Sequence, residues 1–503
     1  MKKIAFAFCL CLFALVQYGF TQSEMTYPED RMSRSHLKSD LYYIASDYLE
    51  GRNTGEEGNN IAAKFIASQI EAAGFKPVAG QNSYFQMINF EERSAPTSAS
   101  LKINKTSFTN KEDFLIVTGK GAKIAKAKAV YAGHGLEADY AGLDVKGKVV
   151  FVMGGIPDNN TPQATFTAMA EKRQRAEAKG AVGLIEIYNL SFPWNFFVRY
   201  FGGSSLAMPG AADGSSGGDE IVYGWINPTN DPEALKMIRE GKKAKVALSS
   251  SGFSSTPKPS QNVVGILEGT DPKLKDEYII LSAHYDHVGV GSQGGGAVTE
   301  QDSIFNGARD NGVGTVSLLA AARAFGEMPP KRSVIFFACT GEEKGLLGSK
   351  YYADNPLVPL DKTIFNLNID NAGYNDVSLV TIFGFGRTGT NEMIKKAAGR
   401  YGLEVLGDPA PEQGLFDRSD NVSFAAKGIP ALTYSLGFRA FDDDINKYYH
   451  QVTDGPETID YDYVLKYAQG FARLARMIAN NPTRPQWKAG DKYEPAAKAL
   501  YKK

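Results

Sequence analysis

Cysteine is scarce in this chain, charge is balanced, and both features exclude classes of protein. Only three cysteines occur among 503 residues, and Cys9 and Cys11 lie in an apolar segment at the N-terminus. The remaining Cys339 cannot form an internal disulfide, so stability is expected to come from a buried core. Lys and Arg number 55 and Asp and Glu 56, a formal net charge of −1. No field over the whole surface then attracts nucleic acid or acidic membranes, and function is expected at a local site.

Long apolar runs are absent beyond the N-terminus. There, Lys2 and Lys3 precede an apolar run over 4–16, and small or polar residues follow near Thr21. This pattern is typical of a cleaved signal peptide. An uncleaved anchor is the alternative, but the run is short for a span of about 20 residues. We therefore predict a signal peptide over 1–22 and an exported protein, periplasmic or extracellular, with no membrane span after cleavage.

The remaining chain is long enough for more than one folding unit. A Ser- and Pro-rich segment at 249–260 predicts a boundary between two of them. After it, strand-like segments (278–283, 334–338, 363–369, 377–383, 431–434) alternate with helix-like segments (312–325, 391–401, 461–479). This alternation predicts an α/β fold whose mixed, largely parallel sheet is flanked by helices. The Lys-rich residues 483–503 are expected to form a solvated C-terminal tail.

Two adjacent glutamates, Glu342 and Glu343, follow one of the most apolar segments, which ends at Cys339. Carboxylates buried side by side repel each other, and a divalent cation relieves that repulsion. One glutamate can then bind the metal while its neighbour takes a proton from water. Two solvated loop glutamates are the alternative, which the apolar strand in front of them disfavours. Cys339 itself is expected to be a small buried strand residue.

Two further motifs offer ligands just after strand-like segments or before helices. His284 follows the segment 278–283, and Asp286, two positions on, can fix the imidazole tautomer of a ligand. Asp310 lies in the Gly-rich turn 306–312 at the start of a helix. A carboxylate there can bridge two cations, although an ordinary helix cap explains a lone Asp equally well.

Asp370 ends a predicted strand, and His450 lies in the polar segment 448–454. Each is weak evidence alone, because a solvated Asp or surface His is common. The order His, Asp, Glu-Glu, Asp, His is more specific, and imidazole with carboxylate but no thiol favours a catalytic zinc site. Two divalent cations would be nearly balanced by Asp310, Glu343, Asp370 and a hydroxide, which leaves Glu342 free to act as a base.

These motifs together resemble the di-zinc aminopeptidases and glutamate-carboxypeptidase-like enzymes of metallopeptidase family 28. The resemblance is carried by His284-Tyr285-Asp286 and by residues 302–311, 341–345, 368–370, 418–420 and 449–450. It implies two zinc ions, one held by His284 and Asp370 and the other by Glu343 and His450. It also implies that Asp310 bridges them. Glu342 would be the general base and later proton donor, and Asp286 would support His284.

The resemblance extends to the domain organisation and to the substrate site. Residues 28–120 and 260–482 are expected to form the catalytic domain. Residues 121–255 resemble an inserted, β-rich protease-associated domain, through 140–148 and 179–183. Candidate substrate contacts are Tyr449, Arg418 and Asn421. Asn421 replaces a His found in many relatives, and Asn371-Ala372 replaces a bulky apolar pair, so the substrate pocket is expected to differ.

Several activities are compatible with this family resemblance. An aminopeptidase acting on peptides or proteins is preferred. A carboxypeptidase or dipeptidyl-type exopeptidase is the second choice, because Arg418 or Arg439 could bind a free carboxylate. A glutaminyl-cyclase-like enzyme shares the expected fold and uses one zinc. A non-catalytic binding module is disfavoured because such proteins usually lack ligands that this chain retains. No nucleic-acid partner is expected.

Overall fold

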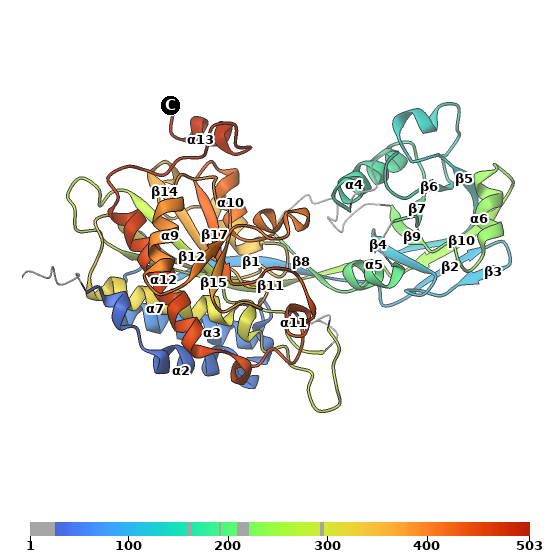
Figure 1. Ribbon diagram of the computed structural model, residues 1–503. Coiled ribbons are helices and arrows are strands. Elements are labelled where there is room, and N and C mark those ends of the chain that lie inside the picture. The colour runs from blue at the N-terminus through green and yellow to red at the C-terminus, as the bar shows by residue number, and fades with distance from the viewer. Residues whose placement is uncertain (1–25, 158–161, 191–192, 209–220, 292–295, 503) are drawn as a thin grey trace, which may run out of the picture.

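The computed structural model of the protein describes residues 26–157, 162–190, 193–208, 221–291 and 296–502 (Figure 1). The predicted signal peptide over 1–22 lies outside these ranges. Within them, no helix combines the length and the apolar character that crossing a lipid bilayer requires. The described chain forms two β-sheets, one of nine strands and one of eight.

The nine-stranded sheet has a parallel centre that meets each flank through an antiparallel pairing, and β15 and β16 at one edge run parallel to each other. Its strand order is β16-β15-β17-β14-β12-β13-β11-β1-β8, and β17, β14, β12 and β13 run parallel. The strands are β1 (Phe85–Ser94), β8 (Ser205–Ala207), β11 (Ser254–Leu267), β12 (Tyr278–His284), β13 (Ser333–Cys339), β14 (Thr363–Ile369), β15 (Leu379–Phe383), β16 (Glu404–Leu406) and β17 (Ala431–Leu436). The predicted mixed α/β fold is confirmed.

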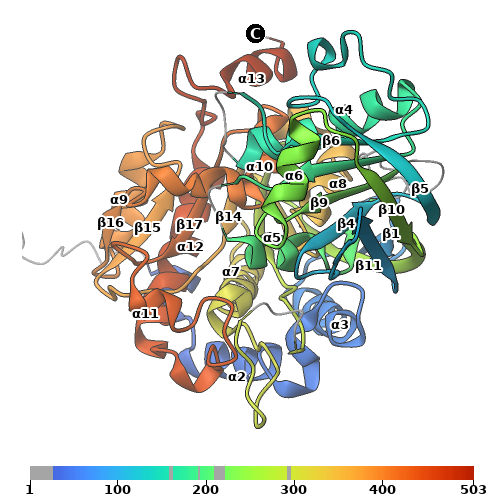
Figure 2. The ribbon, with the colours of Figure 1, turned by 90° about the vertical axis from the view of Figure 1, so that its right-hand side faces the viewer.

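Helices cover both faces of this sheet, which explains why its central strands are buried along their length rather than alternately buried and exposed. Ile279 and Leu281 of β12 join one core cluster, while Ile280 between them joins another on the opposite face. The first cluster packs under α2 (Arg34–Ile44), α3 (Glu57–Ala72), α7 (Gly314–Glu327), α9 (Asn391–Gly399) and α12 (Tyr461–Asn480). The second packs under α8 (Leu347–Asp354) and α10 (Asn421–Ala426). Figures 1 and 2 show α9 and α12 side by side.

The eight-stranded sheet has its own core on each face. Its order is β3-β2-β10-β5-β6-β7-β9-β4. The strands are β2 (Ala99–Ile103), β3 (Thr106–Phe108), β4 (Phe114–Thr118), β5 (Ala122–Tyr131), β6 (Val149–Met153), β7 (Gly183–Ile187), β9 (Val222–Ile226) and β10 (Lys245–Ser250). Helix α6 (Pro232–Arg239) packs on one face, and α4 (Pro162–Ala178) and α5 (Trp194–Phe201) pack on the other. The sheet begins at Ala99, earlier than the boundary predicted at 121.

The boundary predicted at the Ser- and Pro-rich segment 249–260 falls where the chain passes from β10 of the eight-stranded sheet to β11 of the nine-stranded sheet, but most of the segment is strand and not a linker. It runs into β11, a strand of 14 residues. Pro257 and Pro259 lie opposite Glu91 and Asn89 of β1, whereas β13 pairs with β11 only from Val263 onward. Among the described strands, β1 alone pairs with the part of β11 that contains the prolines. Proline has no N–H to donate, and it is tolerated here because no second strand on the other side requires a hydrogen bond.

The C-terminal residues 483–503 are not the solvated tail that was predicted. Trp487 is only 6% exposed and donates its Nε1–H to the carbonyl of Gly428 at 3.2 Å. Asp491 forms a 2.7 Å ion pair with Arg387, and α13 (Glu494–Leu500) follows. The many lysines of this segment predicted exposure to solvent, but the buried Trp487 holds the segment against the part of the chain that forms the nine-stranded sheet. The remaining short helix, α11 (Asp443–Asn446), precedes His450.

Candidate functional site

The candidate ligands meet because three neighbouring parallel strands end at the same edge of the sheet. Strand β12 lies between β13 and β14. Its last residue, His284, is level with Cys339 at the end of β13, and Ala283 is level with Ile369 at the end of β14. Asp370 follows β14 directly, and Glu342 and Glu343 follow β13 within four residues. Carboxyl ends of parallel strands are where α/β proteins place their sites.

Two groups of possible ligand atoms form at this edge, and Asp310 belongs to both. In one group, His284 Nε2 lies 3.2 Å from Asp370 Oδ1 and 3.4 Å from Asp310 Oδ1. In the other, His450 Nε2 lies 3.1 Å from Asp310 Oδ2 and 3.3 Å from Glu343 Oε2. Asp310 therefore turns one carboxylate oxygen toward each group, the arrangement expected of a bridging ligand.

The donor set and its spacing fit zinc. Tetrahedral ligands at roughly 2.0–2.1 Å from zinc lie about 3.3 Å from one another, and the four distances within the groups are 3.1 to 3.4 Å. Imidazole and carboxylate donors without thiolate are typical of catalytic zinc. His284 donates its Nδ1–H to the carbonyl of Asp286 at 3.2 Å, which leaves the Nε2 lone pair facing the first group.

The two adjacent glutamates differ in their electrostatics. Burial opposes ionisation of Glu343, but His450 and His287 beside it hold its pKa well below the usual range. Burial raises the pKa of Glu342 well above its usual range, and the carboxylates of Asp370 and Glu343 act in the same direction against His284. Glu343 is thus suited to bind a cation as an anion, and Glu342 is suited to accept and return a proton.

A cavity opens beside both groups. Its polar side includes Asp310, Glu342, Glu343, Asp370 and His450, and its apolar side includes Ala372, Phe383, Leu415, Phe438 and Phe441. Tyr449 and Arg418 also line it. Asn421 does not: its amide is fully buried, donating to the carbonyl of Phe416 and accepting from Thr433. Asn421 therefore supports the wall, and its prediction as a substrate contact is wrong.

Comparison with known proteins agrees with this geometry. Residues 262–475 match the profile of Peptidase family M28. These matched residues are called the M28 domain below. Aminopeptidase YwaD of Bacillus subtilis is 26% identical to this chain. The similar region covers 65% of this chain and 61% of the length of that relative. Leucine aminopeptidase 2 of Trichophyton rubrum is 22% identical, over 93% of this chain and 90% of the relative.

Solved structures share the fold of the M28 domain and its neighbouring sheet. The aminopeptidase from Aneurinibacillus sp. strain AM-1 has a TM-score of 0.62 at 20% identity, covering 92% of this chain and 98% of that one. BSAP, a zinc aminopeptidase from Bacillus subtilis, has a TM-score of 0.52 at 21% identity, covering 90% and 97%. At such identities the likeness shows the fold alone.

Within the M28 domain, Asp286 supports the glutamates more directly than it supports His284. Its Oδ1 accepts the backbone N–H of Glu342 at 3.2 Å, and its Oδ2 accepts from Thr54 at 3.0 Å. His284 Nδ1 lies 3.7 Å from the Asp286 carboxylate, farther than from the Asp286 carbonyl. Burial raises the pKa of Asp286 to about 6, with His284 opposing and Glu343 adding to the rise. Asp286 thus fixes the turn that carries both glutamates.

Sequence reasoning gave no role to three further residues of the M28 domain. Arg309 and Asp454 form a buried ion pair of 2.8 Å, which fastens the turn carrying Asp310 to the loop carrying His450. His287 lies in the second group of possible ligands and contacts Glu343. Arg309 and Asp454 lie inside segments that the sequence had singled out, and His287 directly follows one, so proximity to a predicted ligand was the available signal. The sequence could not predict that Arg309 pairs with Asp454, because 145 positions separate the two residues.

Proposed function

We propose that this protein is a zinc-dependent aminopeptidase whose M28 domain holds two zinc ions. The observation that carries the proposal is the pair of ligand groups sharing Asp310 at the mouth of the cavity. The relatives named aminopeptidases, and the structural neighbour named a zinc aminopeptidase, support the same activity. The proposed substrates are peptides or proteins with a free amino terminus.

In this proposal His284 and Asp370 hold one metal, and Glu343 and His450 hold the other, with Asp310 between them. Bound zinc would polarise a peptide carbonyl and lower the pKa of water. Glu342 would take the proton of the attacking water and return it to the leaving amine. Its raised pKa, and the backbone N–H bond to Asp286 that fixes its turn, support this role.

Tyr449 is the proposed donor to the developing oxyanion. It lines the cavity beside His450. Burial, with Asp310 and Glu343 adding to the effect, raises the pKa of Tyr449 well above its usual range. The phenol therefore keeps its proton at neutral pH and can donate a hydrogen bond where negative charge develops.

The apolar wall of the cavity supports a preference for an apolar side chain at the cleaved end of the substrate. Phe383 and Phe438 are buried in this wall, and Leu415 and Phe441 continue it. Ala372, which the sequence flagged as a small replacement for a bulky residue, also lines the cavity. Its short side chain leaves room that a larger residue would fill.

A carboxypeptidase-type activity is the second candidate, and Arg418 favours it. This exposed guanidinium lines the cavity and has no hydrogen-bond or ion-pair partner among the described residues. A guanidinium is well suited to bind a carboxylate in a bidentate manner. Arg439, the other candidate, is paired with Asp376 at 2.7 Å and does not line the cavity.

A substrate panel separates the two candidates. Aminoacyl-nitroanilides and short peptides, each free and N-acetylated, would be tested with and without a zinc chelator. Chelator-sensitive cleavage of the free-amine substrates alone is expected. Cleavage of N-acetylated peptides from the carboxyl end would replace the aminopeptidase assignment with the second candidate. A protein that binds no zinc would overturn both.

Export and domain organisation complete the proposal. The predicted signal peptide over 1–22 supports secretion to the periplasm or beyond. The eight-stranded sheet, between the two parts of the chain that build the M28 domain, is the proposed protease-associated insert. Its proposed role is to shape access of substrates, because it contributes none of the candidate ligands, which lie at the end of strands of the nine-stranded sheet or in the loops beside them. Mass spectrometry of exported protein would locate the mature N-terminus.

A further inference from the structure

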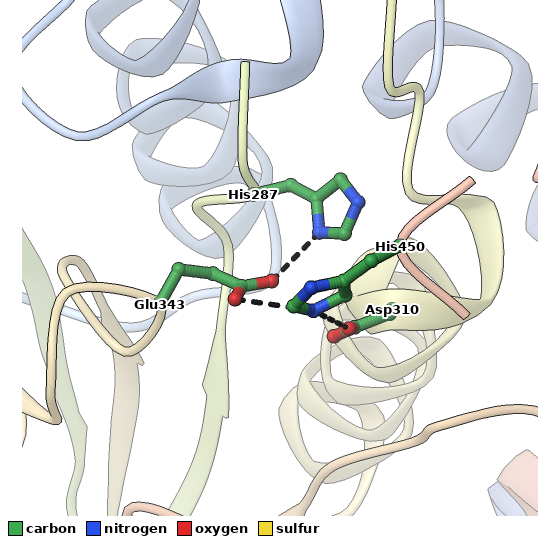
Figure 3. A group of neighbouring side chains, drawn as sticks. All are labelled: His287, Asp310, Glu343 and His450. Carbon is green, nitrogen blue, oxygen red and sulfur yellow. Dashed lines mark hydrogen bonds and ion pairs between the residues drawn. The ribbon is translucent and has the colours of Figure 1, made fainter. Parts of the chain in front are cut away.

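His287 is a buried histidine of the metal centre to which neither the sequence motifs nor the proposed ligand set gives a role. It follows β12 by three residues and is 0% exposed. Its Nδ1 lies 2.8 Å from Glu343 Oε1, and its ring meets that of His450 edge to face at 5.5 Å (Figure 3). The two oxygens of Glu343 thus face different histidines, Oε1 toward His287 and Oε2 toward His450.

The contact with Glu343 has the length of a hydrogen bond and is too short for two ligands of one metal. Ligands of a tetrahedral zinc lie about 3.3 Å apart, as His450 Nε2 and Glu343 Oε2 do at 3.3 Å. The 2.8 Å between His287 Nδ1 and Glu343 Oε1 is that of a charge-assisted N–H···O bond. A carboxylate that binds a cation can only accept hydrogen bonds, so Nδ1 must carry the proton of this contact, and its lone pair is not free to bind metal.

The surrounding backbone is shaped to hold this imidazole in place. His287 donates its backbone N–H to the carbonyl of Arg52 at 3.3 Å, and Arg52 donates to the carbonyls of Asn306 and Gly307. Gly307 has φ +56°, and a Cβ there would lie 2.5 Å from the His287 ring. A side chain at 307 would therefore displace the imidazole, so glycine is required for the ring to sit against this turn.

We propose that His287 is a positioning residue that donates from Nδ1 to Glu343 Oε1 and leaves only Oε2 to bind the second metal. The inference rests on the proposed two-zinc function. Residues that orient a metal-bound carboxylate by hydrogen bonding raise its affinity for the ion, and their loss typically costs about 10–100-fold in metal affinity. The site shared by His450, Asp310 and Glu343 should depend on His287, and the site of His284 and Asp370 should not.

Two substitutions distinguish positioning from direct ligation. His287→Asn places an amide N–H close to the position of Nδ1 and keeps the donor, whereas His287→Leu removes it at similar bulk. Zinc affinity would be measured for both sites by titration of metal-free protein against a competing chelator, without any assay of activity. His36→Leu on the exposed face of α2 is the matched control. Thermal unfolding of the metal-free variants would establish that each is folded.

The expected result is one site weakened about 10–100-fold in His287→Leu, the other site unchanged, and both near wild type in His287→Asn. Equal loss in Asn and Leu variants would make His287 a ligand and overturn the positioning role. Unchanged affinity in a folded His287→Leu variant would overturn it as well. Fewer than two zinc ions in the wild-type protein would instead count against the proposed function, independently of His287.

Discussion

The two sheets bury charge in opposite ways. In the eight-stranded sheet, Lys172 of α4 and Glu186 of β7 form an ion pair of 2.7 Å with side chains 2% and 0% exposed. Lys172 also donates to the carbonyls of Met153 and Gly155, and Glu186 accepts from Tyr223 at 2.5 Å. Both charges of this pair therefore have partners from the same chain, as buried charges require.

Around the nine-stranded sheet, some buried charges are paired in the same way, as Arg309 and Asp454 are, but the carboxylates at the edge of the sheet have no Lys or Arg partner among the described residues. Asp310, Glu343 and Asp370 converge with histidines, and Glu342 lines the same cavity. The buried guanidinium of Arg52 donates to four backbone carbonyls and not to a carboxylate. Burial lowers the pKa of Arg52 to about 10, with Asp286 and Asp310 opposing that fall. The difference teaches that buried charge completed within the chain supports a scaffold, whereas buried charge left incomplete marks a site for an external cation.

The sharpest test of this difference is Glu342→Gln. The substitution keeps size and hydrogen bonding but removes the proton acceptor, so kcat should fall by about 10³- to 10⁴-fold, at the upper end of what general base catalysis contributes. Zinc content should stay at the wild-type value, because Glu342 lies in neither ligand group. Steady-state kinetics and elemental analysis of the same preparation would be compared with Glu300→Gln, an exposed glutamate. Substantial residual turnover in Glu342→Gln would show that Glu342 is not the general base.

Removal of metal should destabilise the nine-stranded sheet and leave the other sheet unaffected. Each ion present at 1,000 times its Kd contributes about 4 kcal/mol to the free energy of unfolding, and its loss also exposes Asp310, Glu343 and Asp370 to mutual repulsion. Hydrogen exchange with and without chelator, resolved by peptide, would measure this. Equal loss of protection over β5, β6 and β7 would contradict the comparison.

The complementary test is Lys172→Met in the eight-stranded sheet. It leaves Glu186 buried without its cation, a change that typically costs about 3–5 kcal/mol. Burial raises the pKa of Glu186 even though Lys172 opposes the rise. Removing the Lys172 ammonium group should therefore raise the pKa of Glu186 further. A raised folded-state pKa makes the ionised form unfavourable, and the cost should therefore be full above that pKa and shrink as pH falls below it.

Denaturant unfolding of Lys172→Met from pH 4 to 8 would show this trend. The double variant Lys172→Met, Glu186→Leu should recover stability, because both charges are then absent. Zinc affinity should match the wild type in both variants, since neither residue lies near the ligand groups. A change of zinc affinity in either variant would mean that the buried charges of the eight-stranded sheet are coupled to the metal site, and would contradict their separate roles.

The sequence predicted the ends of the central strands of the nine-stranded sheet well, because parallel strands buried on both faces are rich in apolar residues. The boundaries of β14 agree, and β12 and β13 differ by a residue or so. Local composition gave wrong predictions where contacts with distant residues decide the structure. The prolines of β11 are compatible with a strand because that part of β11 pairs with β1 alone among the described strands. The lysine-rich C-terminal segment is held in place by the buried Trp487. His287 could not be placed because its partner, Glu343, lies 56 positions away. The order of motifs predicted which ligands come together, but not which carboxylate oxygen each histidine faces.

The smallest expected effect concerns Arg418, the one cavity guanidinium without a described partner. Because it is exposed, a contact with a substrate carboxylate should contribute at most about 1 kcal/mol, roughly a fivefold change in kcat/KM. Arg418→Gln should lower kcat/KM for dipeptides with a free α-carboxylate and spare the matching C-terminal amides. Arg439→Gln, whose parent residue is already paired with Asp376, is the control. If amides and free acids suffer equally, Arg418 acts on the cavity wall and not on a carboxylate, and the apolar side of the cavity alone would set the substrate preference.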